Sequence, residues 1–346
     1  MQKTLSGTPA EDGYIMPGRF SKHEKTFITW PPKNEKLVSL FRDEVVEVAK
    51  AIAKFEEVNI IADPADYNEV KKRCGLFSKI IKIPTDAAWI RDNGPMFVKN
   101  KNNDIAAVHF NFNGRGNKFP YKKVRQLPNS LAEYLDIPYY QTNFILEGGA
   151  ISIDGEGTLI ATEQTLLHPN RNGKKSKDEV EKHLYNYLGI TKVIWLYKGL
   201  VEDSGEYSTD GHVDNVVEYI SPGKVMVQTV KDKLNPNYKI LEENLERLKK
   251  EKDARGRNLE LIEMDVLPYI KDEEGLSYAV PYTNYYIVNG AIISPKLGVE
   301  EDERGFEILQ QTFPNHKIIG VPSASQAFGG GGLGCITQQL PISNRK

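Results

Sequence analysis

Four successive glycines, Gly329 to Gly332, and a fifth at Gly334 lead directly into Cys335 near the C-terminus. Glycine lacks a Cβ atom, so such a segment can adopt backbone conformations that other residues avoid and can approach a small ligand closely. A thiolate is a strong nucleophile, and a lone cysteine with histidine and aspartate elsewhere in the chain is a candidate covalent catalyst. A buried structural thiol is the ordinary alternative. The case for Cys335 therefore depends on the other polar motifs.

Four further polar motifs are spread along the chain. They occupy residues 89–95, with Trp89 and Asp92, residues 147–149, with Glu147, residues 210–215, with His212 and Asp214, and residues 283–285, with Asn284. We expect His212 and Asp214 to lie on one strand; residues two apart then face the same side, which places a proton carrier beside a fixed negative charge. If all the motifs converge, one cavity holds a thiol, an imidazole and three carboxylates.

Asp92, Glu147 and Asp214 would repel one another unless they are protonated, bound to a metal, or facing a cation. A metal is the weaker choice, because the chain has no His-x-x-x-His or Cys-x-x-Cys motif and a metal leaves the cysteine unexplained. A planar guanidinium fits better, since carboxylates accept its donors in pairs. Each motif alone also has a structural interpretation: a local Arg91–Asp92 ion pair, a turn acceptor at Glu147, a satisfied interior histidine at His212. One site accounts for all the motifs together.

Composition excludes several classes of protein. The chain has 346 residues, with 45 basic and 47 acidic side chains and a net charge of −2, so a surface for nucleic acid is not expected. We find no apolar core of a signal peptide and no run long enough to span a bilayer, which predicts no membrane partner and a cytoplasmic location. Two cysteines fit a reducing compartment. Cys74, without a polar motif around it, is interpreted as structural.

Amphipathic helices followed by short β-type runs recur five times. The second helix is interrupted near Pro128, and the third opens with Ser176 and Glu179 at the spacing of a capping box. Repeats of this size predict modules packed around an axis, at whose centre equivalent motifs would meet. The helix and strand pairs are residues 35–55 and 58–61, 124–135 and 137–140, 176–188 and 192–196, 238–252 and 259–262, and 300–313 and 317–321; further strands are expected at 104–110, 158–162 and 224–228.

With these motifs in place, the chain resembles the agmatine deiminases of the guanidine-modifying pentein superfamily, which are related to bacterial peptidylarginine deiminase. The resemblance implies an α/β fold, a propeller of five ββαβ-type modules with residues 1–346 as a single catalytic domain and the active site on the pseudo-fivefold axis. It also implies a hydrolase acting on the C–N bonds of linear amidines, which converts agmatine to N-carbamoylputrescine and ammonia without a cofactor or a metal. The matching segments are residues 12–17, 29–31, 86–95, 146–149, 168–172, 209–215 and 335–339.

The resemblance also assigns roles. Cys335 is the expected nucleophile and His212 the general acid and base, while Glu147 holds His212. Asp92 and Asp214 are expected to grip the guanidinium nitrogens of the substrate. Two further residues, Trp89 and Asn284, complete the expected substrate-binding set together with Glu206, which is discussed next.

Several positions depart from the family pattern. Gly334 replaces a histidine that often precedes the nucleophile, Ala324-Ser325 replaces an Arg-Glu pair, a segment at 110–117 replaces one that contains tryptophan, and Ser208 replaces a carboxylate. These changes concern the far end of the substrate. Of the nearby acidic residues we favour Glu206 over Asp210 as the partner of the agmatine ammonium, and Arg115 is the nearest basic residue.

Three functions follow from these observations. The first is an agmatine deiminase, the second a deiminase of free arginine, peptidyl-arginine or another guanidine, and the third a non-catalytic pentein that serves as a binding protein. The retained nucleophile and acid–base pair argue against the third, because a binding surface has no need of them. The expected partner is a small-molecule guanidine, with a homodimer or higher homo-oligomer left open.

Overall fold

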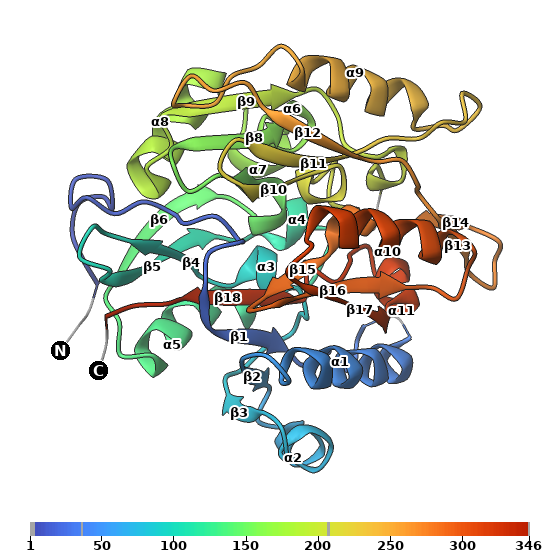
Figure 1. The fold of residues 1–346 in the computed structure, drawn as a ribbon. Coiled ribbons are helices and arrows are strands. Elements are labelled where there is room, and N and C mark those ends of the chain that lie inside the picture. The colour runs from blue at the N-terminus through green and yellow to red at the C-terminus, as the bar shows by residue number, and fades with distance from the viewer. Residues whose placement is uncertain (1–3, 36, 206–207, 345–346) are drawn as a thin grey trace.

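The computed structural model describes residues 4–35, 37–205 and 208–344. Within them, five sheets share one plan: a first strand pairs antiparallel with a second, and a third strand, reached through a helix, pairs parallel with the second. This is the ββαβ-type module that the family resemblance implied, and its helix and third strand are the pair predicted from the repeat. Figure 1 shows the sheets arranged around a common centre, near which the short helix α3 (Ile90–Asn93) lies.

Four modules follow one another along the chain. Their elements are β4 (Met96–Lys99), β5 (Ile105–Asn111), α5 (Leu127–Tyr134) and β6 (Tyr139–Ile145); β7 (Ser152–Ile153), β8 (Thr158–Thr162), α8 (Lys177–Leu188) and β9 (Lys192–Leu196); β10 (Val217–Ser221), β11 (Lys224–Gln228), α9 (Tyr238–Leu248) and β12 (Glu260–Met264); and β15 (Tyr286–Val288), β16 (Ala291–Lys296), α10 (Glu301–Thr312) and β17 (Lys317–Pro322). A hairpin of β13 (Tyr269–Lys271) and β14 (Ser277–Ala279) stands between the last two.

The remaining module joins the two ends of the chain. The C-terminal strand β18 (Thr337–Pro341) pairs antiparallel with β1 (His23–Thr29), which pairs parallel with β2 (Glu57–Ala62) after α1 (Val38–Ile52). The helix α2 (Tyr67–Cys74) and the strand β3 (Lys79–Lys82) extend this sheet. In Figure 1 the red β18 accordingly runs beside the blue β1. The ring of modules is thus closed by hydrogen bonds between chain ends, and the fold is a five-module α/β propeller.

Local sequence explains most of these elements. The apolar residues of α1, such as Phe41, Val45 and Ala49, are buried at steps of three and four positions. Helix α8 begins with the predicted capping box, in which Ser176 Oγ accepts from the Glu179 amide and the Glu179 carboxylate accepts from the Ser176 amide. The segment at 124–135 is divided near Pro128, as expected, into the 3₁₀ helix η1 (Val124–Gln126) and α5. Pro128 stands in the first turn of α5, where its missing amide hydrogen breaks no helical bond.

All five polar motifs lie at equivalent places, in the tight turn just before the first strand of each module. These turns are α3 before β4, η2 (Gly148–Ala150) before β7, η4 (Val213–Asn215) before β10, η5 (Tyr282–Asn284) before β15, and the turn at residues 333–336 before β18. Neighbouring turns are in contact: α3 with η2, η2 with η4, and η4 with η5. The expectation of a strand through His212 and Asp214 is therefore wrong. His212 precedes a 3₁₀ turn that contains Asp214.

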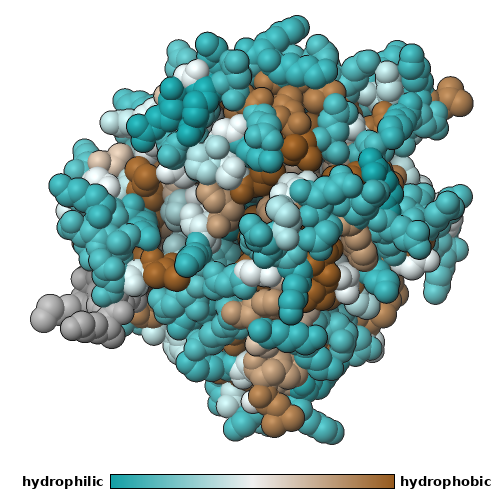
Figure 2. All heavy atoms as spheres, viewed as in Figure 1, coloured by the Kyte–Doolittle hydropathy of each residue, from teal (hydrophilic) through white to brown (hydrophobic). Residues whose placement is uncertain are grey.

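On the face drawn in Figure 2, hydrophilic residues predominate and hydrophobic ones lie in separate patches. Within the residues that the structure describes, there is no helix with the length and apolar character needed to cross a membrane.

Candidate active site

Cys335 lies in the turn before β18, and both its backbone amide and its backbone carbonyl are hydrogen-bonded. Its amide donates to the Gly332 carbonyl at 3.0 Å, and its carbonyl accepts from the Arg91 amide at 3.0 Å. The preceding amide, Gly334 N, donates to Asn284 Oδ1 at 2.7 Å, and Asn284 Nδ2 stands 3.8 Å from the thiol sulfur. Only 1% of Cys335 is exposed. The predicted nucleophile is thus buried at the centre of the ring of turns.

Carboxylates and the imidazole converge beside this thiol. Asp214 Oδ2 is 3.9 Å from the Cys335 sulfur. His212 lies between two carboxylates, with Nε2 at 3.3 Å from Glu147 Oε2 and Nδ1 at 3.8 Å from Asp92 Oδ1. A methyl group built on Gly149 would come within 3.0 Å of His212 Nδ1, Asp214 Oδ2 and Asp92 Oδ1. Glycine at this position therefore lets three side chains meet over the backbone.

The charges of this cluster shift the pKa values of its members. Burial raises the pKa of Asp214 to about 7, although His212 and Arg19 oppose the rise. Burial also favours protonated Glu147, but the charge of Arg171 and the hydrogen bond of His212 outweigh it and lower the Glu147 pKa to about 2. Burial lowers the pKa of His212, yet the surrounding carboxylates raise it above its ordinary value. The cluster thus favours an ionised Glu147 and a His212 that holds its proton more tightly than a free imidazole does.

The thiol is kept protonated in this arrangement. Burial, and then the charges of Asp214 and Asp92, raise the pKa of Cys335 well above its ordinary value, while Arg115 opposes them. A cation placed among the carboxylates would favour the thiolate. Two polar atoms of the site, His212 Nδ1 and Asp214 Oδ1, are buried without a hydrogen-bond partner among the described residues. Unpaired buried polar atoms are unfavourable, so both are placed to gain from a bound polar ligand.

Arg115 occupies a place that the sequence did not predict. Its Nε and Nη2 donate to Asp92 Oδ2 at 2.9 and 2.6 Å, and its Nη1 donates to the Gly330 carbonyl at 2.9 Å. The side chain is fully buried. The partner of Asp92 is therefore Arg115 rather than Arg91, which instead donates to the Gly334 carbonyl and to Gln339. The local Arg91–Asp92 ion pair is thus ruled out.

Glu147 is fixed by a second arginine that sequence reasoning did not single out. Arg171 Nε donates to both oxygens of Glu147, at 2.9 and 3.2 Å, and its Nη1 donates to Asp210 Oδ2 at 2.5 Å. Arg171 lies in the short helix α7 (Pro169–Asn172), which is part of the motif at 168–172. Asp210 also accepts from Lys118 Nζ at 2.6 Å. The Glu147 carboxylate is thus neither a turn acceptor nor solvent-exposed, since it links Arg171 to His212.

The remaining predicted residues are placed as follows. Trp89 is buried, with the Arg115 guanidinium carbon 5.0 Å from its ring centroid and with Gly329 and Gly331 packed on its edge. Asn284 contacts the Cys335 loop, as given above. Glu206 lies outside the described residues. Cys74 is fully buried at the end of α2, and its pKa is raised by burial to about 11, which fits its structural interpretation.

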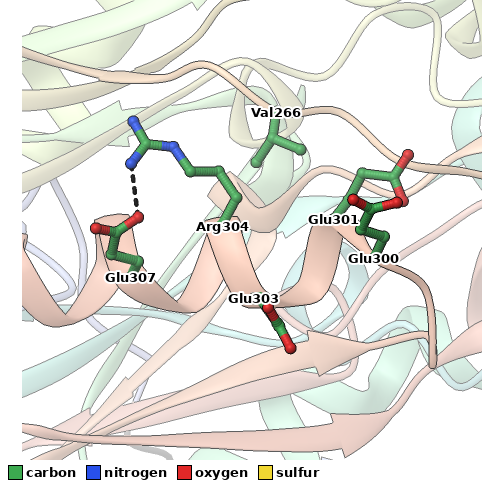
Figure 3. Close-up of a pocket in the computed structure, with 6 residues that line it drawn as sticks. All are labelled: Val266, Glu300, Glu301, Glu303, Arg304 and Glu307. Atoms are coloured by element: carbon green, nitrogen blue, oxygen red, sulfur yellow. Dashed lines mark hydrogen bonds and ion pairs between the residues drawn. The ribbon is translucent and has the colours of Figure 1, made fainter.

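A cavity of about 600 Å³ adjoins the site beyond Trp89. We call it the vestibule; its lining includes the acidic residues Glu35, Asp86 and Glu274 and the aromatic residues Trp89, Phe119, Tyr278 and Phe328. Another hollow, of about 620 Å³, runs along α10 between Val266 and Glu307 (Figure 3), and its lining contains acidic side chains and Arg304 but neither cysteine nor histidine. The lining of the vestibule has no cysteine or histidine either, but it includes Trp89 and Gly329, which belong to the segments that carry Asp92 and Cys335. Of these two hollows, the vestibule is therefore the one that adjoins the site.

A buried nucleophile, an imidazole between two carboxylates and a third carboxylate against the sulfur suit attack on a cationic, planar carbon centre. His212 can carry protons to and from a leaving group and a water. Asp214 and Asp92 can pair with the nitrogens of a planar cation. Among the described residues, histidine, cysteine and carboxylate side chains do not form a group that could hold a metal ion.

Comparisons with known proteins agree with this geometry. A protein of Listeria monocytogenes named "Putative agmatine deiminase 1" is 36% identical over 365 residues, which cover 98% of this chain and 99% of that protein. The solved agmatine deiminase of Enterococcus faecalis is 31% identical, with a TM-score of 0.92 and 99% of both chains covered. An agmatine deiminase of C. jejuni, solved with substrate bound in a cysteine-to-serine variant, is 26% identical, with a TM-score of 0.86 over 96% of this chain and 97% of that one. The sequence model of the Porphyromonas-type peptidyl-arginine deiminases matches residues 15–341, and the chain therefore belongs to that family.

Proposed function

We propose that this protein is an agmatine deiminase, a cytoplasmic hydrolase that converts agmatine to N-carbamoylputrescine and ammonia within one catalytic domain. The observation that carries the proposal is the buried Cys335 sulfur 3.9 Å from Asp214, beside an imidazole held between Glu147 and Asp92. The Asp92 carboxylate already receives a guanidinium, that of Arg115, through two hydrogen bonds. This supports a guanidinium compound as the substrate class.

In the proposed mechanism, Asp92 and Asp214 bind the guanidinium nitrogens and the substrate charge favours the Cys335 thiolate. The sulfur attacks the guanidinium carbon and forms a C–S bond. One C–N bond of the tetrahedral adduct then breaks, and ammonia leaves with a proton from His212. An amidino group remains on the sulfur. His212 next takes a proton from water, whose oxygen bonds to the carbon as the C–S bond breaks and the ureido product is released.

The first test is turnover of agmatine, free arginine and an arginine peptide, with the ureido product and ammonia both measured. We expect turnover of agmatine that Cys335→Ala abolishes without loss of folding. An acid quench during turnover of labelled agmatine should leave an amidino group on the peptide that contains Cys335. Product formation without label on that peptide would reject the covalent mechanism, and binding without any turnover would favour a non-catalytic role.

One observation favours a second candidate, deimination of a guanidine that carries a carboxylate, such as free arginine. Lys118 Nζ donates to Ser208 Oγ at 3.0 Å and to Asp210 Oδ1 at 2.6 Å. A cation therefore already pairs with Asp210, the acidic residue two positions before His212, and a carboxylate rather than an ammonium would be attracted there. If wild type prefers arginine and Lys118→Ala reverses the preference in kcat/KM, this candidate replaces agmatine.

A further inference from the structure

The guanidinium of Arg115 is bonded to the carboxylate that the proposed substrate needs. Asp92 Oδ2 accepts both Arg115 hydrogen bonds, while Asp92 Oδ1 accepts from the Gly149 amide at 3.1 Å and faces His212. Both oxygens are thus engaged. A substrate guanidinium that binds Asp92 in the proposed manner therefore competes with Arg115 for Oδ2.

Arg115 also closes the space around the nucleophile. Its Nη1 is bonded to the Gly330 carbonyl in the glycine-rich segment, and its guanidinium carbon lies 5.0 and 5.1 Å from the rings of Trp89 and Phe119. Asp92, Cys335 and Arg115 are each at most 3% exposed. Since Trp89 and Phe119 line the vestibule as well, the guanidinium is in contact with the walls through which a ligand would enter.

The backbone that carries Arg115 is built in an unusual conformation. Residues 114–117, the segment α4 (Gly114–Asn117), have φ values of 69°, 54°, 82° and 65°. The left-handed region is unfavourable for an arginine, so the contacts of the Arg115 side chain must hold the segment in place. Glycine at 114 and 116 gives this segment alternative backbone conformations once those contacts are lost.

The vestibule offers the displaced side chain an acidic environment. Glu35 lines it, accepts from the Ala88 amide at 3.3 Å and lies close enough to Arg115 for their charges to interact. Burial raises the pKa of Glu35 to about 7, and Arg115 opposes that rise. A guanidinium that moves toward Glu35 would therefore favour the ionised carboxylate.

Resting on the proposed function, we propose that Arg115 is a built-in competitor for Asp92 that selects guanidinium ligands and expels the ureido product. Only a ligand with a charged, forked donor replaces the two hydrogen bonds that Asp92 loses when Arg115 leaves. An amine lacks the fork. The ureido group formed by the reaction is neutral, so after turnover Arg115 regains Asp92 and displaces the product.

Binding measurements test this role directly. In a Cys335→Ala background, Arg115→Ala should bind agmatine at least tenfold more tightly and should bind N-carbamoylputrescine more tightly by a similar factor. The decisive ligand is butylurea, which has the ureido group without the ammonium that the product keeps and should also bind at least tenfold more tightly, because removal of a positive charge alone would not tighten the binding of a neutral ligand. Arg115→Lys keeps the charge but not the forked donors. Its affinity for these ligands should therefore lie between that of the protein with Arg115 and that of Arg115→Ala. The control is Arg125→Ala, which removes an exposed arginine on the same connection. Unchanged or weaker binding of butylurea to Arg115→Ala would overturn the proposal.

A second measurement needs no ligand. Iodoacetamide should alkylate Cys335 at least tenfold faster in Arg115→Ala than in wild type, with the buried Cys74 as the reference in the same digest. Arg115 favours the thiolate electrostatically, so its loss would slow alkylation if it did not also open the site. Slower or equal alkylation overturns the proposal. If no variant binds agmatine, the proposed function fails, and alkylation still decides whether Arg115 closes the site.

Discussion

At the scale of single residues, the site is defined by which groups are ionised before a ligand arrives. Three carboxylates surround one imidazole and one thiol, and the two arginines Arg115 and Arg171 neutralise Asp92 and Glu147. Asp214 remains without such a partner beside the sulfur, and its buried Oδ1 has none among the described residues. Its raised pKa follows from this position. Asp214 is therefore the carboxylate that an incoming cation changes most.

The affinity for agmatine should depend on pH through Asp214. Its pKa in the free protein is about 7, and a bound cation lowers that pKa, so binding releases a proton below pH 7. Affinity should then rise with pH, by up to about tenfold per unit below 7, and become level above it. Calorimetry of agmatine with Cys335→Ala between pH 5.5 and 8.5 measures this. The rise of affinity with pH should disappear in the Asp214→Asn, Cys335→Ala double variant. If the rise persists there, the group that releases the proton is His212.

Arg171 is a positioning residue, because it acts on the substrate through Glu147 and His212. In Arg171→Gln the Glu147 carboxylate loses the charge that keeps its pKa at about 2, and that pKa should rise. We expect kcat to fall about a hundredfold with a smaller change in KM, and the acidic limb of the pH–rate profile to move to higher pH. The control is Arg257→Gln, which removes an exposed arginine that pairs with Glu156 and Asp253 away from the site. It should leave kcat and the pH–rate profile unchanged. An unshifted profile in Arg171→Gln would reduce Arg171 to a structural role.

The sequence indicated the reactive residues but not the arginines that hold them. Cys335, His212, Asp92, Glu147 and Asp214 were predicted because each stands in a polar motif with a chemical meaning. Arg115 and Arg171 are 23 and 24 positions from the carboxylates they bind. No local spacing relates such pairs, because the antiparallel pairing of β4 with β5 and of β7 with β8 brings the two residues of each pair together. The place of Arg171 in the motif at 168–172 was the available signal.

At the scale of elements, the site is made by five tight turns rather than by strands. Regular periodicity predicted α1, α8, α9 and α10 and their following strands within a few residues, since amphipathic spacing reports burial of one face. The turns carry no such periodicity. His212 was therefore placed on a strand, although it follows two residues with positive φ, Asp210 at 61° and Gly211 at 83°.

The turn before His212 requires glycine at position 211. A Cβ atom there would lie 2.4 Å from Gln164 Oε1 and 3.1 Å from the Gly199 amide nitrogen, in addition to the strain of a positive φ. Gly211→Ala should displace His212 and lower kcat/KM at least a hundredfold. Gly256→Ala is the matched control, because its φ is 80° and its Cβ would meet nothing within 4 Å. Equal activities of the two variants would show that the turn does not position His212.

At the scale of the whole molecule, the catalytic turn depends on how the ring closes. Cys335 lies two residues before β18, and β18 is the strand that joins the C-terminal end to β1. The chain ends meet on one sheet: Thr4 bridges to Tyr139 of β6, and the Asn344 amide donates to Asn103 beside β5. The nucleophile is thus positioned by contacts between the first and last segments of the chain.

A circular permutant tests whether the pairing of β18 with β1, rather than the position of the chain ends, places Cys335. Joining the two ends with about eight Gly and Ser residues and opening the chain between Lys233 and Leu234, in an exposed turn before α9, preserves every strand pair of the ring. We expect kcat within about threefold of wild type, because exposed turns tolerate new termini. A chain ended after Ile336 lacks β18 and should lose cooperative unfolding as well as activity. If the permutant folds with its normal unfolding transition but is inactive, closure through β18 and β1 does not by itself place the nucleophile.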